Sequence, residues 1–459
     1  MNDVNKLNNR ERFKRLIHFI VSAMIVVCEV LIFAYVWYEC YSPSAGDPYS
    51  LYRKGHWAVI GIYALIIILL TKTFGGFKIG YLRGIDVMLS NVLAIIVTNV
   101  VAYLQVCLVT HQYLNVQPLL RMTVVEIILI AIWTYMMKFI MQRLYPPRQM
   151  IVVYGKYSPK DLISKINTRK DKYNICASIN ISAGIEKVKE EVLNYEAVVI
   201  CDVPSETRNV ILKHCFDHSI RTYVTPKISD IMIRGGDSIH LFDTPLILSR
   251  NHGLSIEHQF GKRIMDIVLS LIALLILSPF MLLSAVLIKC YDGGPIFYTQ
   301  NRLTINGKVF RIIKFRSMCV DSEKHGARLA KKNDDRITPI GRFLRNIHFD
   351  EIPQLFNILK GDMSFVGPRP ERPEIAEEYK TEIPEFHYRL KVKAGLTGYA
   401  QVYGKYNTTP YDKLKLDMSY IMNYSLWLDF KLLILTFKII FKKEAAEGVD
   451  SHQVTASKK

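Results

Sequence analysis

Acidic residues are scarce in this 459-residue chain, and so are charged residues of either sign. Charged side chains make up 22% of the sequence and hydrophobic ones 50%. This composition excludes an intrinsically disordered or collagen-like protein and argues against an ordinary soluble enzyme. The 41 acidic residues are outnumbered by 59 basic ones, which gives a formal net charge of +18 at pH 7. Such an excess suits polyanions: nucleic acid, anionic lipid headgroups or phosphorylated substrates.

Closely spaced cysteines and a glycine-rich nucleotide loop are also absent. The eight cysteines include no C-x-x-C pair, so neither a zinc site nor a disulfide framework is indicated. Gly155 follows an apolar run, but Lys156, Tyr157 and Ser158 come next instead of further glycines. Without those glycines the backbone cannot approach a pyrophosphate closely, so we do not expect a bound dinucleotide there.

Long apolar runs dominate the first third of the chain. Four of them, near residues 16–38, 57–74, 85–109 and 119–141, are long enough for membrane-spanning helices, which need about 20 residues. Basic residues cluster in the amino-terminal tail, between the second and third runs, and after the fourth. This pattern predicts a four-helix transmembrane bundle over residues 1–145 with both ends in the cytoplasm.

A fifth apolar run, residues 264–290, contains Ser278 and Pro279 at its centre. Proline removes a backbone donor and serine can bond a freed carbonyl, so a bend is expected. The basic residues before and after the run would then reach the same face of the bilayer. We therefore predict a re-entrant membrane hairpin that enters one leaflet, with a kinked transmembrane helix as the alternative.

Short apolar runs alternate with polar helical stretches between the fourth and fifth long runs. The strand candidates are residues 150–155, 174–181, 197–203 and 221–225. This alternation predicts a degenerate Rossmann-like α/β domain over residues 146–250, with a structural or regulatory role. The remaining segment, 251–459, is then a separate α-rich domain, and the whole chain is classed as an α/β membrane protein.

Candidate chemistry is concentrated in that last segment. Asp350 and Glu351 precede Pro353, which places them near the first turn of an amphipathic helix. One carboxylate could attack phosphorus while the other holds Mg²⁺, and Arg345 and Arg369 offer forked donors to phosphate oxygens. Taken alone, an Asp-Glu pair at a helix start is an ordinary charge decoration.

Two basic stretches rich in aromatic residues lie upstream, GGPIFYTQNR (293–302) and FRIIKFRSM (310–318). They bring Arg302, Lys314 and Arg316 close together as phosphate-compatible side chains. RNA binding is the alternative, but no RNP-type or helix-turn-helix pattern accompanies them, so no nucleic-acid partner is predicted.

These blocks occur in one order from residue 261 to 443, and this region resembles the bacterial sugar transferase family, the monotopic phosphoglycosyl transferases. The matching blocks are GKR..D (261–266), the apolar hairpin with Ser278-Pro279, GGPIFYTQNR, KFRSM, DEIPQL.N.LKGDMSFVGPRP and GLTGYAQVYGK (395–405). The four spans and the Rossmann-like unit further resemble the large subgroup of that family.

The resemblance implies transfer of a hexose 1-phosphate from a UDP-sugar, UDP-glucose or UDP-galactose, to undecaprenyl phosphate with release of UMP. It implies that Asp350 is the nucleophile and forms a sugar-phosphoryl aspartate, and that Glu351 is the Mg²⁺ ligand. Arg345, Arg369, Pro368 and Pro370 would fix phosphate and the leaving nucleotide, while Lys262, Arg263 and Asp266 would receive the polyprenyl phosphate. The catalytic domain would face the cytoplasm at the bacterial inner membrane.

Two other functions compete with this one. A polytopic phosphosugar transferase would need more spans than the four or five found here. The other alternative is a catalytically silent membrane scaffold or regulator of polysaccharide assembly. Such a protein need not retain Asp350, Glu351 and Arg345, so their presence argues against it. The lipid bilayer is a further partner, and a homo-oligomer is left open. The terminal segment 426–443 is expected either to lie in the membrane interface or to pack on the catalytic core.

Overall fold

A computed structural model describes residues 2–42, 53–249, 253–319, 336–404 and 408–440. The chain forms two compact units, residues 1–225 and 226–459. Lys405, the last residue of the GLTGYAQVYGK block, and residues 441–443 of the predicted terminal helix lie outside the described residues.

The first unit begins with long apolar helices: α1 (Asn2–Val36), continued by the π-helical turn η1 (Trp37–Tyr41), then α2 (Arg53–Phe74), α3 (Gly84–Thr110) and α4 (Gln117–Leu144). α1 contacts α2 and α4, and α3 contacts the same two helices. Within the described residues, these four and α9 are the helices long and apolar enough to cross a membrane.

One buried polar network lies among these helices. Tyr63 donates to Oε1 of Glu126 at 2.9 Å, and Asn99 donates to Oε2 at 2.8 Å. Glu126 is therefore hydrogen-bonded inside the helix packing, where an unpaired carboxylate would be costly.

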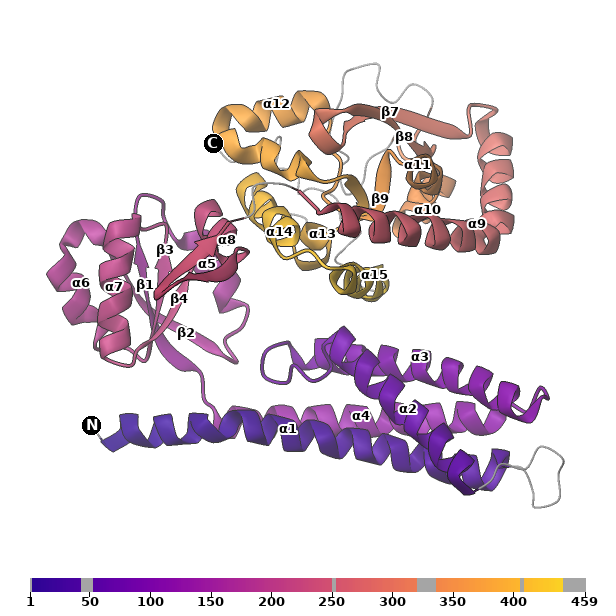
Figure 1. Cartoon of the computed structure of the whole chain (residues 1–459), viewed down its shortest axis with the longest axis horizontal. Helices are drawn as coiled ribbons and strands as arrows, with labels where there is room; N and C mark the ends of the chain where they lie inside the picture. The colour runs from indigo at the N-terminus through magenta and orange to yellow at the C-terminus, as the bar shows by residue number, and fades with distance from the viewer. Residues whose placement is uncertain (1, 43–52, 250–252, 320–335, 405–407, 441–459) are drawn as a thin grey trace. The chain divides into compact units, whose positions relative to one another are not determined.

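The α/β part of the first unit has four parallel strands, at the four positions given as strand candidates from the sequence. These are β1 (Arg148–Tyr154), β2 (Tyr173–Asn180), β3 (Ala197–Cys201) and β4 (Arg221–Val224), in the order β2-β1-β3-β4. α6 (Ile185–Val192) and α7 (Ser205–Asp217) pack on one face, and α5 (Lys160–Asn167) packs on the other (Figure 1). This order is that of the flavodoxin-like, doubly wound fold.

Gly155 follows β1 at the point where the strand order reverses. A Cβ on Gly155 would lie 2.1 Å from the carbonyl oxygen of Asp202. The glycine is therefore required by the close approach of the loop after β3, which is a packing reason and needs no nucleotide.

The second unit contains short elements around one long helix. They are α8 (Ile228–Arg234), β5 (Asp237–Leu241), β6 (Thr244–Leu248), α9 (Ile256–Asp292), β7 (Phe297–Leu303), η3 (Ile305–Gly307), β8 (Val309–Phe315), α10 (Pro339–Asn346), η4 (Phe349–Glu351), α11 (Gln354–Lys360), β9 (Met363–Val366), α12 (Pro373–Glu382), η5 (Pro384–Lys391), β10 (Ala394–Thr397), α13 (Tyr399–Tyr403), α14 (Pro410–Met422) and α15 (Leu426–Ile440). The strands form three two-stranded sheets, β5-β6, β7-β8 and the parallel pair β9-β10.

α8 belongs to the core of this second unit. Ile228 and Ile231 are buried with Leu414 and Met418 of α14. Residues 226–250, which the sequence analysis assigns to the Rossmann-like region, therefore lie in the same compact unit as the candidate catalytic residues. The division of the chain into three domains otherwise stays a prediction.

α9 is one bent helix with Pro279 inside it. Figure 1 shows its two arms meeting at a sharp bend, and Oγ of Ser278 bonds the carbonyl of Leu275 at 3.1 Å. A straight helix of this length would extend roughly 55 Å. Because of the bend, both arms pack on the same unit: Leu274 lies against the core around Leu355, and Ile288 lies with Phe315. The bend agrees with the predicted hairpin, while the depth of α9 in a membrane stays a prediction.

α15 packs on the core along one side. Leu432 and Leu435 are buried, whereas Trp427 and Phe430 are exposed. The helix thus satisfies the packing expectation and also leaves an aromatic surface.

Candidate active site

Asp350 and Glu351 lie in a short turn that precedes the helix. His348 takes a left-handed backbone conformation with φ of 55°, and residues Phe349–Glu351 form the 3₁₀ turn η4. α11 begins only after Pro353, which occupies its N-cap position. Both carboxylates thus lie close to the helix start, as the sequence predicts, but in a separate 3₁₀ turn before the α-helix. The cause is the proline, which starts the helix and leaves the two acidic residues outside it.

Glu351 is held by two cations from different elements. Nζ of Lys314, on β8, donates to Oε1 of Glu351 at 2.6 Å, and Nη2 of Arg369, in the loop after β9, donates to the same oxygen at 2.8 Å. Asp350 lies beside this cluster and is 9% exposed. The arrangement puts one buried carboxylate next to a second one whose charge is already compensated.

The pKa values of the two carboxyl groups are shifted in opposite directions. Burial raises the pKa of Asp350, and the neighbouring charge of Glu351 raises it further, against Lys314 and Arg345. Burial also opposes ionisation of Glu351, but Arg369 and Lys314 outweigh it and hold the pKa of that carboxyl well below its usual range. Two titratable groups whose pKa values are driven apart are suited to different roles in one reaction.

The loop that carries Arg369 is fixed by surrounding backbone and side chains. A Cβ on Gly367 would lie 2.4 Å from the carbonyl oxygen of Lys393, so only glycine fits there. The carbonyl of Pro368 accepts from the amide of Gly395 at 2.9 Å, and the carbonyl of Pro370 accepts from Arg302 at 3.1 Å. The two prolines restrict the backbone on either side of Arg369.

A buried arginine, Arg389, holds the Arg369 loop in place, and the sequence did not predict it. Nη2 of Arg389 donates to the carbonyl of Arg369 at 2.9 Å and lies 2.8 Å from Asp417, while its Nη1 lies 3.4 Å from Glu371. Burial raises the pKa of Asp417 to about 6, although Arg389 opposes this shift. No local motif marks Arg389 or Asp417, because their partners are distant in sequence.

A cavity of about 270 Å³ adjoins Arg369. Its lining includes Pro368, Pro370, Lys380 and His387. This volume is below the usual range of pockets for drug-sized ligands, roughly 300–1,000 Å³, so it has room for only part of a ligand of that size.

The residues predicted to receive the lipid phosphate have protein partners. Lys262 bonds Asp429 at 2.6 Å and Tyr420 at 3.2 Å. Arg263 donates at 2.6 Å to each of two carbonyls near the end of α11, those of Ile358 and Leu359. Asp266 accepts from Oγ of Ser364 at 2.9 Å and from the amide of Phe365 at 3.0 Å. These contacts connect the start of α9 to α11, β9 and α15, and a role toward the acceptor stays a prediction.

The other predicted basic residues fall into two groups. One group interacts with the carboxylate pair: Lys314 and Arg369 donate to Glu351, and the charge of Arg345 lowers the pKa of Asp350. Arg302 supports the Arg369 loop, and Arg316 pairs with Asp292, which joins the end of β8 to the end of α9.

The carboxylate pair is compatible with one magnesium ion. Across the described part of the chain, no group of three or more His, Cys, Asp or Glu side chains is arranged to hold a metal. Magnesium usually takes only one or two protein carboxylates and completes its shell with water and substrate phosphate oxygens. Glu351 and the adjacent Asp350 fit that kind of site.

The chain thus combines helices long and apolar enough to cross a membrane with an acidic pair supported by two cations. A family model described as bacterial sugar transferase matches residues 257–443. The chain is 35% identical over 311 residues to the UDP-N-acetylgalactosamine-undecaprenyl-phosphate N-acetylgalactosaminephosphotransferase of Aeromonas hydrophila. The matched region covers 66% of this chain and 69% of the relative. The chain belongs to the bacterial sugar transferase family.

Other relatives act on other sugars. The UDP-glucose:undecaprenyl-phosphate glucose-1-phosphate transferase of Xanthomonas campestris pv. campestris is 37% identical over 235 residues, 49% of this chain and 48% of the relative. The undecaprenyl-phosphate galactose phosphotransferase of Salmonella typhimurium is 35% identical over 254 residues, 51% of this chain and 52% of the relative. The chain thus spans about half the length of these two relatives, and the names of the three relatives give three different sugars.

Proposed function

We propose that this protein transfers a hexose 1-phosphate from a UDP-sugar, UDP-glucose or UDP-galactose, to undecaprenyl phosphate. The product is the diphosphate-linked sugar, and UMP is released. The observation that carries the proposal is the buried Asp350 beside Glu351, whose Oε1 is shared by Lys314 and Arg369. The names of the relatives support the acceptor and the class of reaction.

The proposed reaction has two displacements at one phosphorus atom. A carboxylate oxygen of Asp350 attacks the sugar-bearing phosphorus of the donor, and the bond to the UMP oxygen breaks. A phosphate oxygen of the lipid then attacks the same phosphorus, and the bond to Asp350 breaks, which regenerates the carboxylate. Splitting the transfer in this way is the general logic of nucleophilic catalysis.

The cations stabilise the charge of these steps. Arg369 presents a forked donor, half exposed, at the edge of the 270 Å³ cavity, and can bond phosphate oxygens as well as Glu351. Glu351, kept ionised, would hold Mg²⁺, which when bound neutralises phosphate oxygens. We assign part of the donor to the cavity beside Arg369.

The setting of the reaction follows from its substrates. A lipid phosphate lies at the membrane surface and a UDP-sugar is water-soluble, so the centre must be at the interface. We propose that the bent α9 enters one leaflet of the bacterial inner membrane from the cytoplasmic side and holds the centre there. The reaction would begin capsule, exopolysaccharide or O-antigen synthesis.

The test is UMP release by the full chain with undecaprenyl phosphate and Mg²⁺, using UDP-glucose, UDP-galactose and their N-acetylated counterparts in turn. Asp350→Asn should abolish release because an amide cannot serve as nucleophile, and Glu351→Gln should be largely inactive. The exposed Glu374→Gln is the matched control and should retain activity. Absence of release with every donor would favour the silent scaffold instead.

A further inference from the structure

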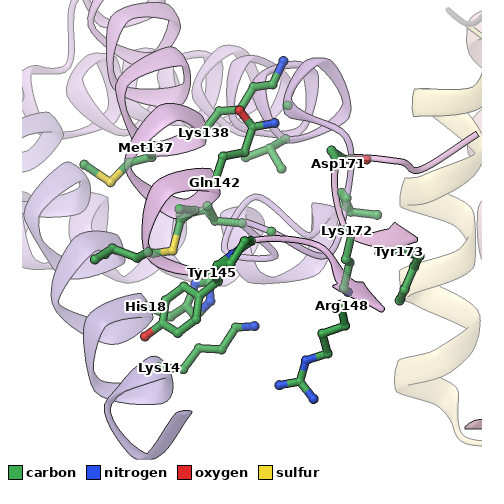
Figure 2. Close-up of a pocket in the computed structure, with 18 of the residues that line it drawn as sticks. Lys14, His18, Met137, Lys138, Gln142, Tyr145, Arg148, Asp171, Lys172 and Tyr173 are labelled. Atoms are coloured by element: carbon green, nitrogen blue, oxygen red, sulfur yellow. The ribbon is translucent and has the colours of Figure 1, made fainter. Parts of the chain in front are cut away.

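A basic pocket lies in the first unit, where α1 and the end of α4 meet the α/β sheet (Figure 2). Its volume is about 120 Å³. Five cations and two carboxylates line it: Lys14, Lys138, Arg148, Lys172, Arg221, Asp171 and Glu196. One of the two carboxylates, Asp171, is already engaged by Arg169, at 2.9 and 3.0 Å. The lining therefore carries a net positive charge.

The cations converge from separate elements. Figure 2 shows Lys14, from α1, and Arg148, from β1, extending toward one another across the pocket. Burial lowers the pKa of Arg148 and the charge of Arg221 lowers it further, against Tyr223 and Glu196. Burial also lowers the pKa of Lys172, with Arg169, Arg221 and Arg148 acting in the same direction and Asp171 opposing them. An anion in the pocket would relieve this repulsion.

Buried polar atoms in the lining have no hydrogen-bond partner. They are Nε1 of Trp133, Oγ1 of Thr134 and both ring nitrogens of His18. The side chains of Trp133 and Thr134 are 6% and 8% exposed. Buried donors of this kind are normally satisfied, so a set of them lining one pocket is suited to a polar ligand.

The lining also includes apolar side chains. Met137, Met141 and Leu144 come from the last turns of α4, at the predicted cytoplasmic end of a membrane helix. The pocket is held in place by Arg169, which bonds the carbonyl of Tyr81 at 2.8 Å and so joins the α/β part to the segment between α2 and α3. Cations beside apolar side chains match an anionic headgroup attached to an acyl chain.

We propose that this pocket binds the phosphate group of an anionic membrane lipid, with its acyl chain along α4. A soluble phosphate would meet the same cations, so the experiment separates the two sources. The proposal does not depend on the catalytic centre, which lies in the other compact unit.

The test uses the full chain in a neutral detergent and measures one-to-one binding by native mass spectrometry. The probes are short-chain phosphatidylglycerol, short-chain phosphatidylcholine and inorganic phosphate. Lys14→Gln with Lys172→Gln should weaken phosphatidylglycerol binding on the order of tenfold or more, since it removes two of the five cations of the lining. The matched control, Lys187→Gln with Lys213→Gln, changes the charge equally on exposed helix surfaces and should bind as the wild type does.

A second variant distinguishes a loss of lipid binding from a loss of folding. Trp133→Phe keeps the ring packing and removes the unpartnered donor, so it should weaken phosphatidylglycerol several-fold without lowering the unfolding temperature. Inorganic phosphate binding as tightly as the lipid would assign the site to a soluble phosphate. Equal affinity in the lysine variant and its control, or equal affinity for phosphatidylcholine, would overturn the proposal.

Discussion

Nζ of Lys262 lies 2.6 Å from Oδ2 of Asp429, in an ion pair whose two side chains are 6% and 0% exposed. The phenol of Tyr420 donates to the other oxygen of Asp429 at 2.7 Å. The pair connects the first arm of α9 to α15. A buried ion pair therefore holds the helix proposed to enter the membrane against the rest of the second unit.

Asp429→Asn should destabilise the second unit by about 3–5 kcal/mol, because it leaves the Lys262 ammonium buried without its counter-charge. Thermal or denaturant unfolding in detergent measures this change. Glu377→Gln, in the exposed pair with Lys380, is the control and should change the unfolding free energy little.

The double variant Lys262→Met with Asp429→Leu tests what Lys262 does. It should recover most of the lost stability, since an apolar pair of similar size often replaces a buried ion pair. A recovered fold with an unchanged KM for undecaprenyl phosphate would make Lys262 a positioning residue. A recovered fold with a greatly raised KM would assign it to the acceptor.

The acidity of Asp350 predicts the shape of the pH profile. The nucleophile must be ionised, and burial together with Glu351 raises the pKa of Asp350 above its ordinary value of 3.8. Activity should therefore fall on acidification, with a midpoint above that value. Lys314→Met removes a cation that lowers this pKa, so the acid limb of kcat/KM should move to higher pH.

Arg311→Met is the control for that shift. Arg311 lies on the same strand, β8, with its side chain exposed. Its loss should leave the acid limb in place. An acid limb that stays fixed in Lys314→Met, or moves to lower pH, would contradict the assignment of Asp350 as the titrating nucleophile.

Patterns local in sequence predicted the elements that depend on local causes. The four strands of the first unit were found because each is a short apolar run between polar segments, and β1 and β3 are indeed buried in the sheet. The bend in α9 was predicted from Pro279, which is also a local cause. Pro353 marked the start of α11 and so placed Asp350 near it, but the separate 3₁₀ turn that holds Asp350 was not predicted.

Pairings across long sequence separations could not be predicted. Lys262 and Asp429 are 167 residues apart, and nothing in the sequence distinguishes a lysine that binds a lipid phosphate from one that binds a buried aspartate. Arg389 and Asp417 were missed for the same reason. The family motifs indicated which residues gather at the centre, but their hydrogen-bond partners required the fold.

The side of the membrane that holds the catalytic unit can be read with single cysteines. In a background lacking the eight native cysteines, Glu382→Cys on α12 should resist a membrane-impermeant maleimide added to intact cells. Gln112→Cys, between α3 and α4, is predicted to face outside and should be labelled. Labelling of both positions would show that α9 crosses the bilayer and would contradict the re-entrant hairpin.

The most direct test of the central claim is covalent labelling of Asp350. The full chain is incubated with a UDP-sugar carrying radioactive phosphorus next to the sugar, without acceptor lipid, and its peptides are analysed by mass spectrometry. The account expects one sugar phosphate on the peptide that contains Asp350, its loss on addition of undecaprenyl phosphate, and no label in Asp350→Asn. Product formation by Asp350→Asn at the wild-type rate, or label on a different residue, would contradict it.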